Sequence, residues 1–179
     1  TKVKNDDSDV AITISDADNT AMTAADLSAI GSATTGTVTV TNETAISGSN
    51  TDVTAALVTA GSKVEVSDAD VTISDADNTA INATVLSNIG SETTGTVTAS
   101  NSIEVTGTIS EVTAALVTSG SKVVAGGAST AATVSDLATV SEGDTLAQVT
   151  NVQAGFTNGI SDAIANLASS GSITSGLTN

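Results

Sequence analysis

The chain has 179 residues, and its 20 acidic residues against 4 lysines give a formal net charge of −16. Nucleic acid is excluded as a partner, because phosphate neutralisation needs lysine or arginine and base stacking needs aromatic or guanidinium planes. Most enzyme chemistry is excluded too, since without histidine or cysteine there is no imidazole base, no thiolate and no ligand set for zinc, haem or iron–sulfur clusters.

Short strands are predicted at intervals along the chain. Five segments alternate β-branched residues with a period of two, which is typical of strands. They are residues 10–14, 36–40, 63–66, 70–73 and 95–98. Proline, which would interrupt the hydrogen bonds of a sheet, is absent from the whole sequence.

Two short helices are predicted between these strands. The first covers residues 23–31, with Thr23 as N-cap, Asp26 at the third helical position and Gly31 as terminator. The second covers residues 51–61, where apolar residues recur at the spacing of one helix face. These residues are Val53, Ala56, Leu57 and Ala60.

The sequence repeats itself. Residues 13–64 match residues 72–123 at a constant offset of 59 without a gap, and 34 of the 52 aligned positions are identical. Each unit resembles two half-units of about 30 residues, the size of one solenoid turn. We divide the chain into a lead-in (1–9), repeat 1 (10–68), repeat 2 (69–127) and a degenerate C-terminal repeat (128–179), which keeps VSD at 134–136 and ISD at 160–162.

A two-turn helix and a single strand are each unstable alone, so stacking of the units is expected. We predict an α/β repeat solenoid with one short strand and one short helix per half-repeat. The strands would pair in one parallel sheet along one side, and the helices would line the other. An all-β solenoid or a row of small β-sandwich domains is the alternative.

The blocks ISDADNTA, TTGTVT and VTAALVT, each present twice, resemble the tandem repeats of very large secreted or cell-surface proteins of marine cyanobacteria and other bacteria. The resemblance covers residues 10–125. It implies a structural role of the surface-layer, adhesin-stalk or calcium-dependent export type. The glycine-rich nonapeptides of the calcium β-roll are missing, so that chemistry is not carried over. Similar repeat fibres occur among phage virion proteins, which keeps a phage-fibre role open.

Acidic turns are the candidate metal sites. Asp-Ala-Asp-Asn follows a predicted strand in both repeats, and further aspartates lie just upstream. Carboxylate and amide oxygens are the ligands that calcium prefers. The same residue types also form turns and cap helices, which is the alternative interpretation. The candidate calcium ligands are Asp9, Asp16, Asp18, Asn19, Asp68, Asp70, Asp75, Asp77 and Asn78.

Ice binding and catalysis are two further activities on which the sequence bears. Thr35, Thr37 and Thr39, with their equivalents 59 residues later, have the alternation of an ice-binding array, although β-propensity alone explains threonine in strands. Catalytic carboxylate pairs need two different environments, whereas repeated residues have similar ones. We therefore expect no enzyme, and ice binding is a minor alternative.

The most favoured function is an extracellular structural module: a spacer, a stalk, or a subunit of a surface layer or filament, with calcium as a rigidifying cofactor. An acidic surface rich in threonine and serine suits a solvated exterior at the cell surface. An adhesin or a phage-fibre binding module is the alternative. No apolar run is long enough to span a membrane, and we expect self-association through open ends or adjoining repeats of the same protein.

Overall fold

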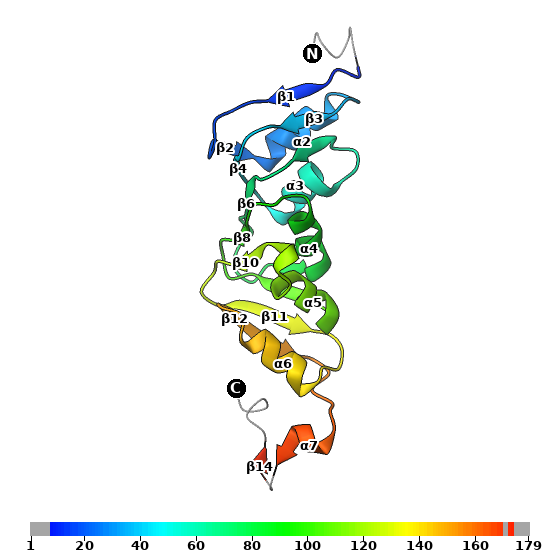
Figure 1. Ribbon diagram of the computed structural model, residues 1–179, viewed down its shortest axis with the longest axis vertical. Coiled ribbons are helices and arrows are strands. Elements are labelled where there is room, and N and C mark those ends of the chain that lie inside the picture. The colour runs from blue at the N-terminus through cyan, green and yellow to red at the C-terminus, as the bar shows by residue number, and fades with distance from the viewer. Residues whose placement is uncertain (1–7, 170–171, 174–179) are drawn as a thin grey trace.

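The computed structural model describes residues 8–169 and 172–173, and in it the chain is elongated (Figure 1). Strands and helices succeed one another along the long axis, from β1 at one end to α7 at the other. Because each helix is preceded by strands, we call a helix together with the strands before it a layer.

The described residues form six layers. The first layer contains β1 (Ile12–Ile14), β2 (Ala21–Thr23) and α2 (Ala24–Ser32). The second contains β3 (Val38–Val40), β4 (Ala45–Gly48) and α3 (Asn50–Val53), which continues as the π-helix η1 (Thr54–Val58). The third layer contains β5 (Val64–Val66), β6 (Asp70–Ile73), β7 (Ala80–Asn82) and α4 (Ala83–Ser91). The fourth contains β8 (Val97–Ala99), β9 (Glu104–Gly107) and α5 (Ile109–Leu116), followed by the 3₁₀ turn η2 (Ser119–Ser121). The fifth layer contains β10 (Val123–Ala125), β11 (Thr130–Val134) and α6 (Val140–Ala147). The sixth contains β12 (Val152–Phe156) and α7 (Ile164–Leu167).

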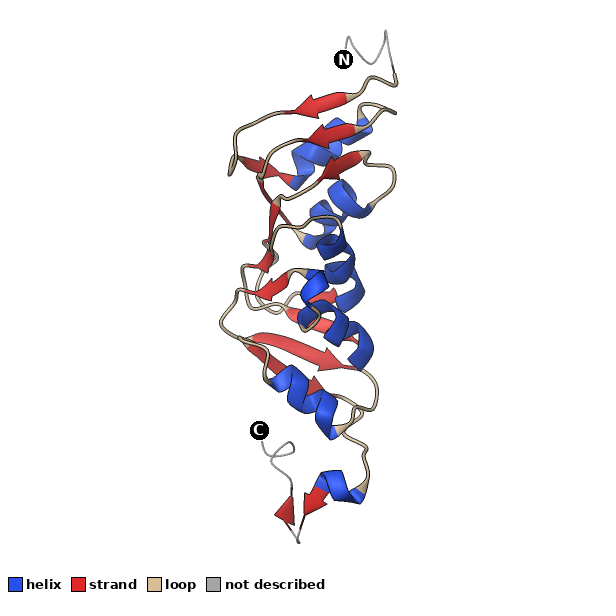
Figure 2. Cartoon of the chain, in the orientation of Figure 1, coloured by secondary structure: helices blue, strands red, loops and turns tan. Residues whose placement is uncertain are grey.

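Three parallel sheets connect the layers. Their strand orders are β1-β3-β5, β10-β8-β6-β4-β2 and β12-β11-β9-β7. The helices α2 to α5 form a column beside the strands (Figure 2). A separate antiparallel pair, β13 (Ala168–Ser169) and β14 (Ser172–Ile173), follows α7.

The predicted repeat solenoid is wrong. The chain is a mixed α/β domain with three parallel sheets of three, five and four strands and, in the described residues, six α-helices. These helices also contradict the all-β solenoid and the row of β-sandwich domains. The prediction of one strand per half-repeat failed because two or three strands precede each of the helices α2 to α6.

Equivalent strands of the two repeats lie in different sheets, although they pair with their neighbours in the same register. At the offset of 59 residues, β1 to β5 of repeat 1 correspond to β6 to β10 of repeat 2. However, β1 belongs to the three-stranded sheet and its equivalent β6 to the five-stranded sheet. The other four strands of repeat 2 likewise lie one sheet further along than their equivalents in repeat 1.

The local predictions fared better than the architecture. Each of the five predicted strands overlaps an observed one, namely β1, β3, β5, β6 and β8. The first predicted helix is α2, and its N-cap Thr23 accepts a hydrogen bond from the amide of Asp26 at 3.1 Å. The second predicted helix begins at Asn50 and ends at Val58, and Ala60 lies outside it and is exposed.

One narrow core of small aliphatic side chains runs through the layers. Leu27, Ile46, Ile73 and Leu86 are among its largest members, and each is at most 1 % exposed. The buried valine, isoleucine, leucine and alanine side chains of successive layers form a single cluster. Such residues fill the thin space between short helices and strands, where large aromatic rings would not fit.

Gly31 has a different role from the predicted one. Helix α2 continues one residue past it to Ser32. A Cβ atom at Gly31 would lie 1.7 Å from the carbonyl oxygen of Ser62, and one at Gly90, its repeat equivalent, 1.6 Å from that of Ser121. Glycine is therefore required because the backbone of the next layer touches the helix at this point.

We expect Gly31→Ala to lower the free energy of unfolding by about 3 kcal/mol, since the added methyl group must displace backbone atoms. The matched control is Gly61→Ala, where the added Cβ meets no atom within 4 Å. It should leave stability unchanged within about 0.5 kcal/mol or raise it slightly. Chemical denaturation of both variants measures the difference, and equal stabilities would contradict the close approach.

Candidate functional site

The two Asp-Ala-Asp-Asn segments form the turns from β1 to β2 and from β6 to β7. Asn19 and Asn78 have φ angles of 60° and 61°, in the left-handed region that asparagine tolerates better than most residues. Their backbone amides donate hydrogen bonds to the carbonyl oxygens of Glu43 (2.6 Å) and Ser102 (2.8 Å), one layer later. Both asparagines are therefore explained by turn geometry.

In repeat 2 the carboxylates of this turn are hydrogen-bond acceptors. Asp75 accepts two bonds from Asn50, one from its backbone amide at 2.6 Å and one from its side-chain Nδ2 at 2.8 Å. Asp77 accepts from the amide of Ser102 at 2.8 Å. In repeat 1 the equivalent Asp16 and Asp18 are exposed.

The upstream aspartates also lie in separate surroundings. Asp70 accepts from the amide of Thr96 at 2.7 Å, and Asp68 from the hydroxyl of Ser67 at 2.9 Å. Asp9 is exposed in the turn before β1. Within the described residues, no group of three or more carboxylates, histidines or cysteines lies together in a way that could hold a metal ion.

Three aspartates contact the first amide of the helix in the preceding layer. Besides Asp75 on Asn50 of α3, Asp136 accepts from the amide of Ile109 in α5 at 2.7 Å. Asp162 accepts from the amide of Val140 in α6 at 3.1 Å. The first amides of a helix have no partner within the helix, and the helix dipole favours a negative charge beside them. We call these three residues the capping aspartates.

Glycine occupies the corresponding position for the other two helices. Gly48 lies against Ala24, the first residue of α2, where an added Cβ would approach the alanine Cβ to 3.0 Å. Gly107 lies against Ala83 of α4 in the same way, at 3.4 Å. The helices α2 to α6 therefore each have either an aspartate or a glycine facing their first residue from the next layer.

Sequence reasoning missed Asp136 and Asp162 as site residues. The available signal was the recurrence of Ile-Ser-Asp or Val-Ser-Asp, which ends at Asp16, Asp68, Asp75, Asp136 and Asp162. Three of these five aspartates are capping aspartates, whereas Asp68 accepts from Ser67. Asp16 belongs to the first layer, and no earlier layer among the described residues has a helix that could donate to it.

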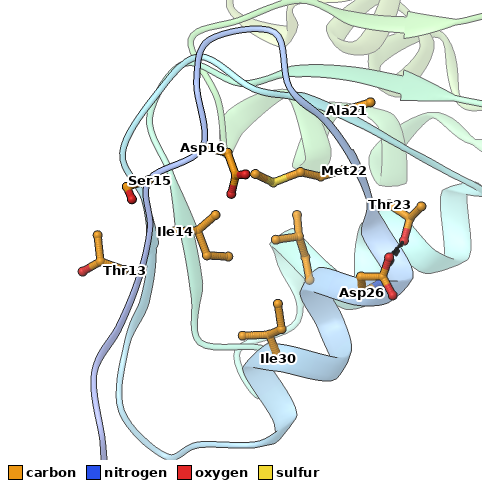
Figure 3. A pocket seen from close by; sticks show the side chains of 10 residues that line it. Thr13, Ile14, Ser15, Asp16, Ala21, Met22, Thr23, Asp26 and Ile30 are labelled. Carbon is orange, nitrogen blue, oxygen red and sulfur yellow. Dashed lines mark hydrogen bonds between the residues drawn. The ribbon is translucent and has the colours of Figure 1, made fainter.

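An open groove lies beside Asp16. It has a volume of about 490 Å³ and is formed by β1, β2 and α2, with Ile14, Met22 and Ile30 on its walls (Figure 3). The carboxylate of Asp16 lies close to the Met22 side chain in this view. No residue among 8–169 and 172–173 donates a hydrogen bond to that carboxylate.

The threonines proposed for ice binding have mixed neighbours. On the three-stranded sheet, Thr39 is flanked by Thr13 and Glu65. On the five-stranded sheet, Thr98 is flanked by Thr72 and Val124. Other residue types therefore interrupt both rows.

The pKa of Asp162 is lowered by its hydrogen bonds. The side-chain amide of Asn166 makes the largest contribution, and the backbone amides of Ala163 and Val140 act in the same direction against partial desolvation. The bonds from Asn166 and Ala163 are both 2.8 Å long. Asp162 thus joins α6 to the start of α7.

The repeat supplies a matched pair for testing the capping aspartates. We expect Asp75→Ala to lower the free energy of unfolding by about 2 kcal/mol, because it removes two hydrogen bonds to a charged acceptor and leaves a helix amide without a partner. The equivalent Asp16→Ala should change it by less than about 0.5 kcal/mol. Denaturant titration at low protein concentration measures both, and an equal loss in the two variants would contradict the capping role.

A pH dependence follows from Asp162. Because its pKa is lower in the folded chain than in the unfolded chain, its contribution to stability is present above the unfolded value and is lost as pH falls through the folded value. The protection factor of the Val140 amide, which is its exchange rate measured by NMR relative to the intrinsic rate at the same pH, should therefore fall below about pH 4 in the wild type. Asp162→Asn should already exchange faster at neutral pH. Identical pH profiles for the two proteins would rule out this linkage.

Comparison with known proteins adds no identity to this geometry. No family model matches the chain, and no curated protein or solved structure matches it significantly. None of the helices in the described part of the chain is long and apolar enough to cross a membrane. The function is therefore argued from the layers, the capping aspartates and the groove.

Proposed function

We propose that the chain is an extracellular structural module that serves as a spacer, a stalk, or a subunit of a surface layer or filament. One observation carries the proposal: hydrogen bonds between parallel strands connect every layer to the next along the long axis. Examples are Ile12 beside Val38 at one end and Thr130 beside Val152 at the other. Continuous pairing in this direction suits a part that transmits load or fixes a distance.

Side-chain contacts between layers support the same role. The capping aspartates add charged hydrogen bonds from layer to layer. Asparagines act similarly: Nδ2 of Asn42 donates to the carbonyl oxygen of Asp16 at 2.5 Å, and its repeat equivalent Asn101 to that of Asp75 at 2.7 Å. These bonds hold neighbouring turns at a fixed spacing.

The surface charge fits an exterior location. No Asp, Glu or Lys side chain in the described residues is fully buried, so the net charge of −16 is presented to solvent. A high net charge of one sign keeps crowded proteins soluble and apart. The resemblance to repeats of secreted and cell-surface proteins supports this location independently.

The test is electron microscopy of intact source cells or particles, labelled with an antibody against the purified chain. We expect label outside the envelope, arranged along filaments, stalks or a layer. Label confined to the cell interior would overturn the proposal. An antibody against a cytoplasmic protein of the same source serves as the control for membrane integrity.

Calcium as a rigidifying cofactor is part of the proposal and has its own test. Among the candidate aspartates, Asp16 and Asp18 in repeat 1 have exposed carboxylates that accept no hydrogen bond within the described residues. If calcium binds there, saturating calcium should raise the melting temperature by about 5 °C over a chelator-treated sample. Asp18→Asn should reduce the increase, whereas magnesium should not reproduce it. An unchanged melting temperature would exclude a rigidifying calcium ion.

A further inference from the structure

The groove beside Asp16 has a repeat equivalent in the interior of the molecule. Residues 13–16 and Ala21, Leu27 and Ile30 of the groove are identical to the residues 59 positions later. In repeat 2, however, this surface is covered. The same structure therefore contains both the open and the occupied form of one surface.

Exposure distinguishes the two forms. Ile73, Ile81 and Ile89 are 0 %, 2 % and 0 % exposed, whereas their equivalents in the groove, Ile14, Met22 and Ile30, are all partly exposed. The equivalent residues Leu27 and Leu86 are buried in both repeats. The apolar walls of the groove in repeat 1 thus lack a cover that the equivalent surface in repeat 2 has.

The occupied form identifies what such a cover must provide. In repeat 2 it consists of β4, α3 and η1: β4 pairs with β6, and α4 packs against α3 and η1. The helix contributes the buried side chains of Val53 and Leu57. Its first amide, that of Asn50, donates to Asp75. The complement is therefore a strand edge, an apolar helix face and a donor for the aspartate.

The free strand edges at the two ends of the molecule are complementary. Within the described residues, β1 pairs only with β3, although its equivalent β6 pairs on both sides. At the other end, β12 pairs only with β11 among the strands that the structure describes. Because the pairing within each of these two sheets is parallel, the free edge of β1 and the free edge of β12 can each accept a further parallel strand.

The far end also carries the apolar side chains that the groove needs. Val152, Ala154 and Phe156 of β12 are partly exposed on the face packed against the core, and Phe156 is the only aromatic residue of the chain. Ile164 of α7 is 79 % exposed, the highest value among the large hydrophobic residues described. Two incomplete apolar surfaces therefore lie at opposite ends of one elongated molecule.

We propose that the groove formed by β1, β2 and α2 binds the β12 and α7 end of a second copy of this chain, in head-to-tail fashion. The carboxylate of Asp16 then accepts a hydrogen bond from the incoming copy, as Asp75 does from Asn50. Such an interface is heterologous and leaves a free groove on the added copy, so it extends into a filament. This inference rests on the proposed structural function and specifies its partner.

Sedimentation velocity of the full chain over a range of concentrations tests the proposal. The wild type should form a concentration-dependent series of oligomers, and high salt should promote it, because both copies carry a net charge of −16. Met22→Glu blocks the groove, and Ile164→Glu blocks the opposite end. Each variant alone should remain monomeric, whereas an equimolar mixture should form dimers and stop there.

Two further variants complete the design. Val124→Glu is the matched control, since Val124 is 49 % exposed on a strand away from both ends, and it should assemble like the wild type. Asp16→Lys blocks the groove without changing its apolar walls. If Met22→Glu lowers the melting temperature, so that loss of assembly could reflect unfolding, Asp16→Lys still tests whether the groove binds the second copy. It should weaken association at least about tenfold.

Several results would overturn the proposal. They are a wild type that stays monomeric, groove variants that assemble normally, dimers of Ile164→Glu alone, and a mixture that remains monomeric. Dimers of Ile164→Glu alone would indicate a symmetric groove-to-groove contact instead. A monomeric wild type combined with label outside the cell would leave the structural function standing as a spacer or stalk, whereas label inside the cell would remove that function whatever the assembly.

Discussion

Parallel strand pairing connects every layer to the next, and in three of the five helices α2 to α6 the first amide adds a hydrogen bond to an aspartate one layer later. Helix α3 has only four α-helical residues before it widens into η1, and a helix of this length is unstable in isolation. Asp75 satisfies its first amide and its Asn50 side chain together. The start of α3 is therefore held both by its own N-cap, Ser49, and by a residue that belongs to the next layer.

This dependence has a direction, and the direction makes the two ends of the molecule unequal. Helices α3, α5 and α6 each receive an aspartate contact from the layer after them, whereas a glycine faces α2 and α4. Within the described residues Asp16 of the first layer faces no helix amide, and the apolar residues Ile14 and Met22 lack the cover found in repeat 2. The groups that join neighbouring layers inside the molecule are therefore an exposed carboxylate and partly exposed apolar side chains on the first layer.

How far the sequence predicted the structure depends on the scale. Strands with alternating β-branched residues, such as β3 and β6, and the capped helix α2 were found where the pattern placed them. Strands β2 and β4 were missed, because AMT and AISG carry too few β-branched residues to give a period-two signal. Their pairing with neighbouring strands, and not their own propensity, makes them extended. Without them the strand count per repeat was wrong, and so was the predicted solenoid.

The candidate site was predictable in part for the same reason. Asp75 and Asn78 were predicted as candidate calcium ligands or turn residues, but their hydrogen-bond partners Asn50 and Ser102 lie 25 and 24 residues away in the sequence, at a distance that no local motif encodes. Asp136 and Asp162 lack the Asp-Ala-Asp-Asn context and were found only from their contacts. A turn signal reports the residue type that a position tolerates, whereas the identity of its donor depends on the stacking.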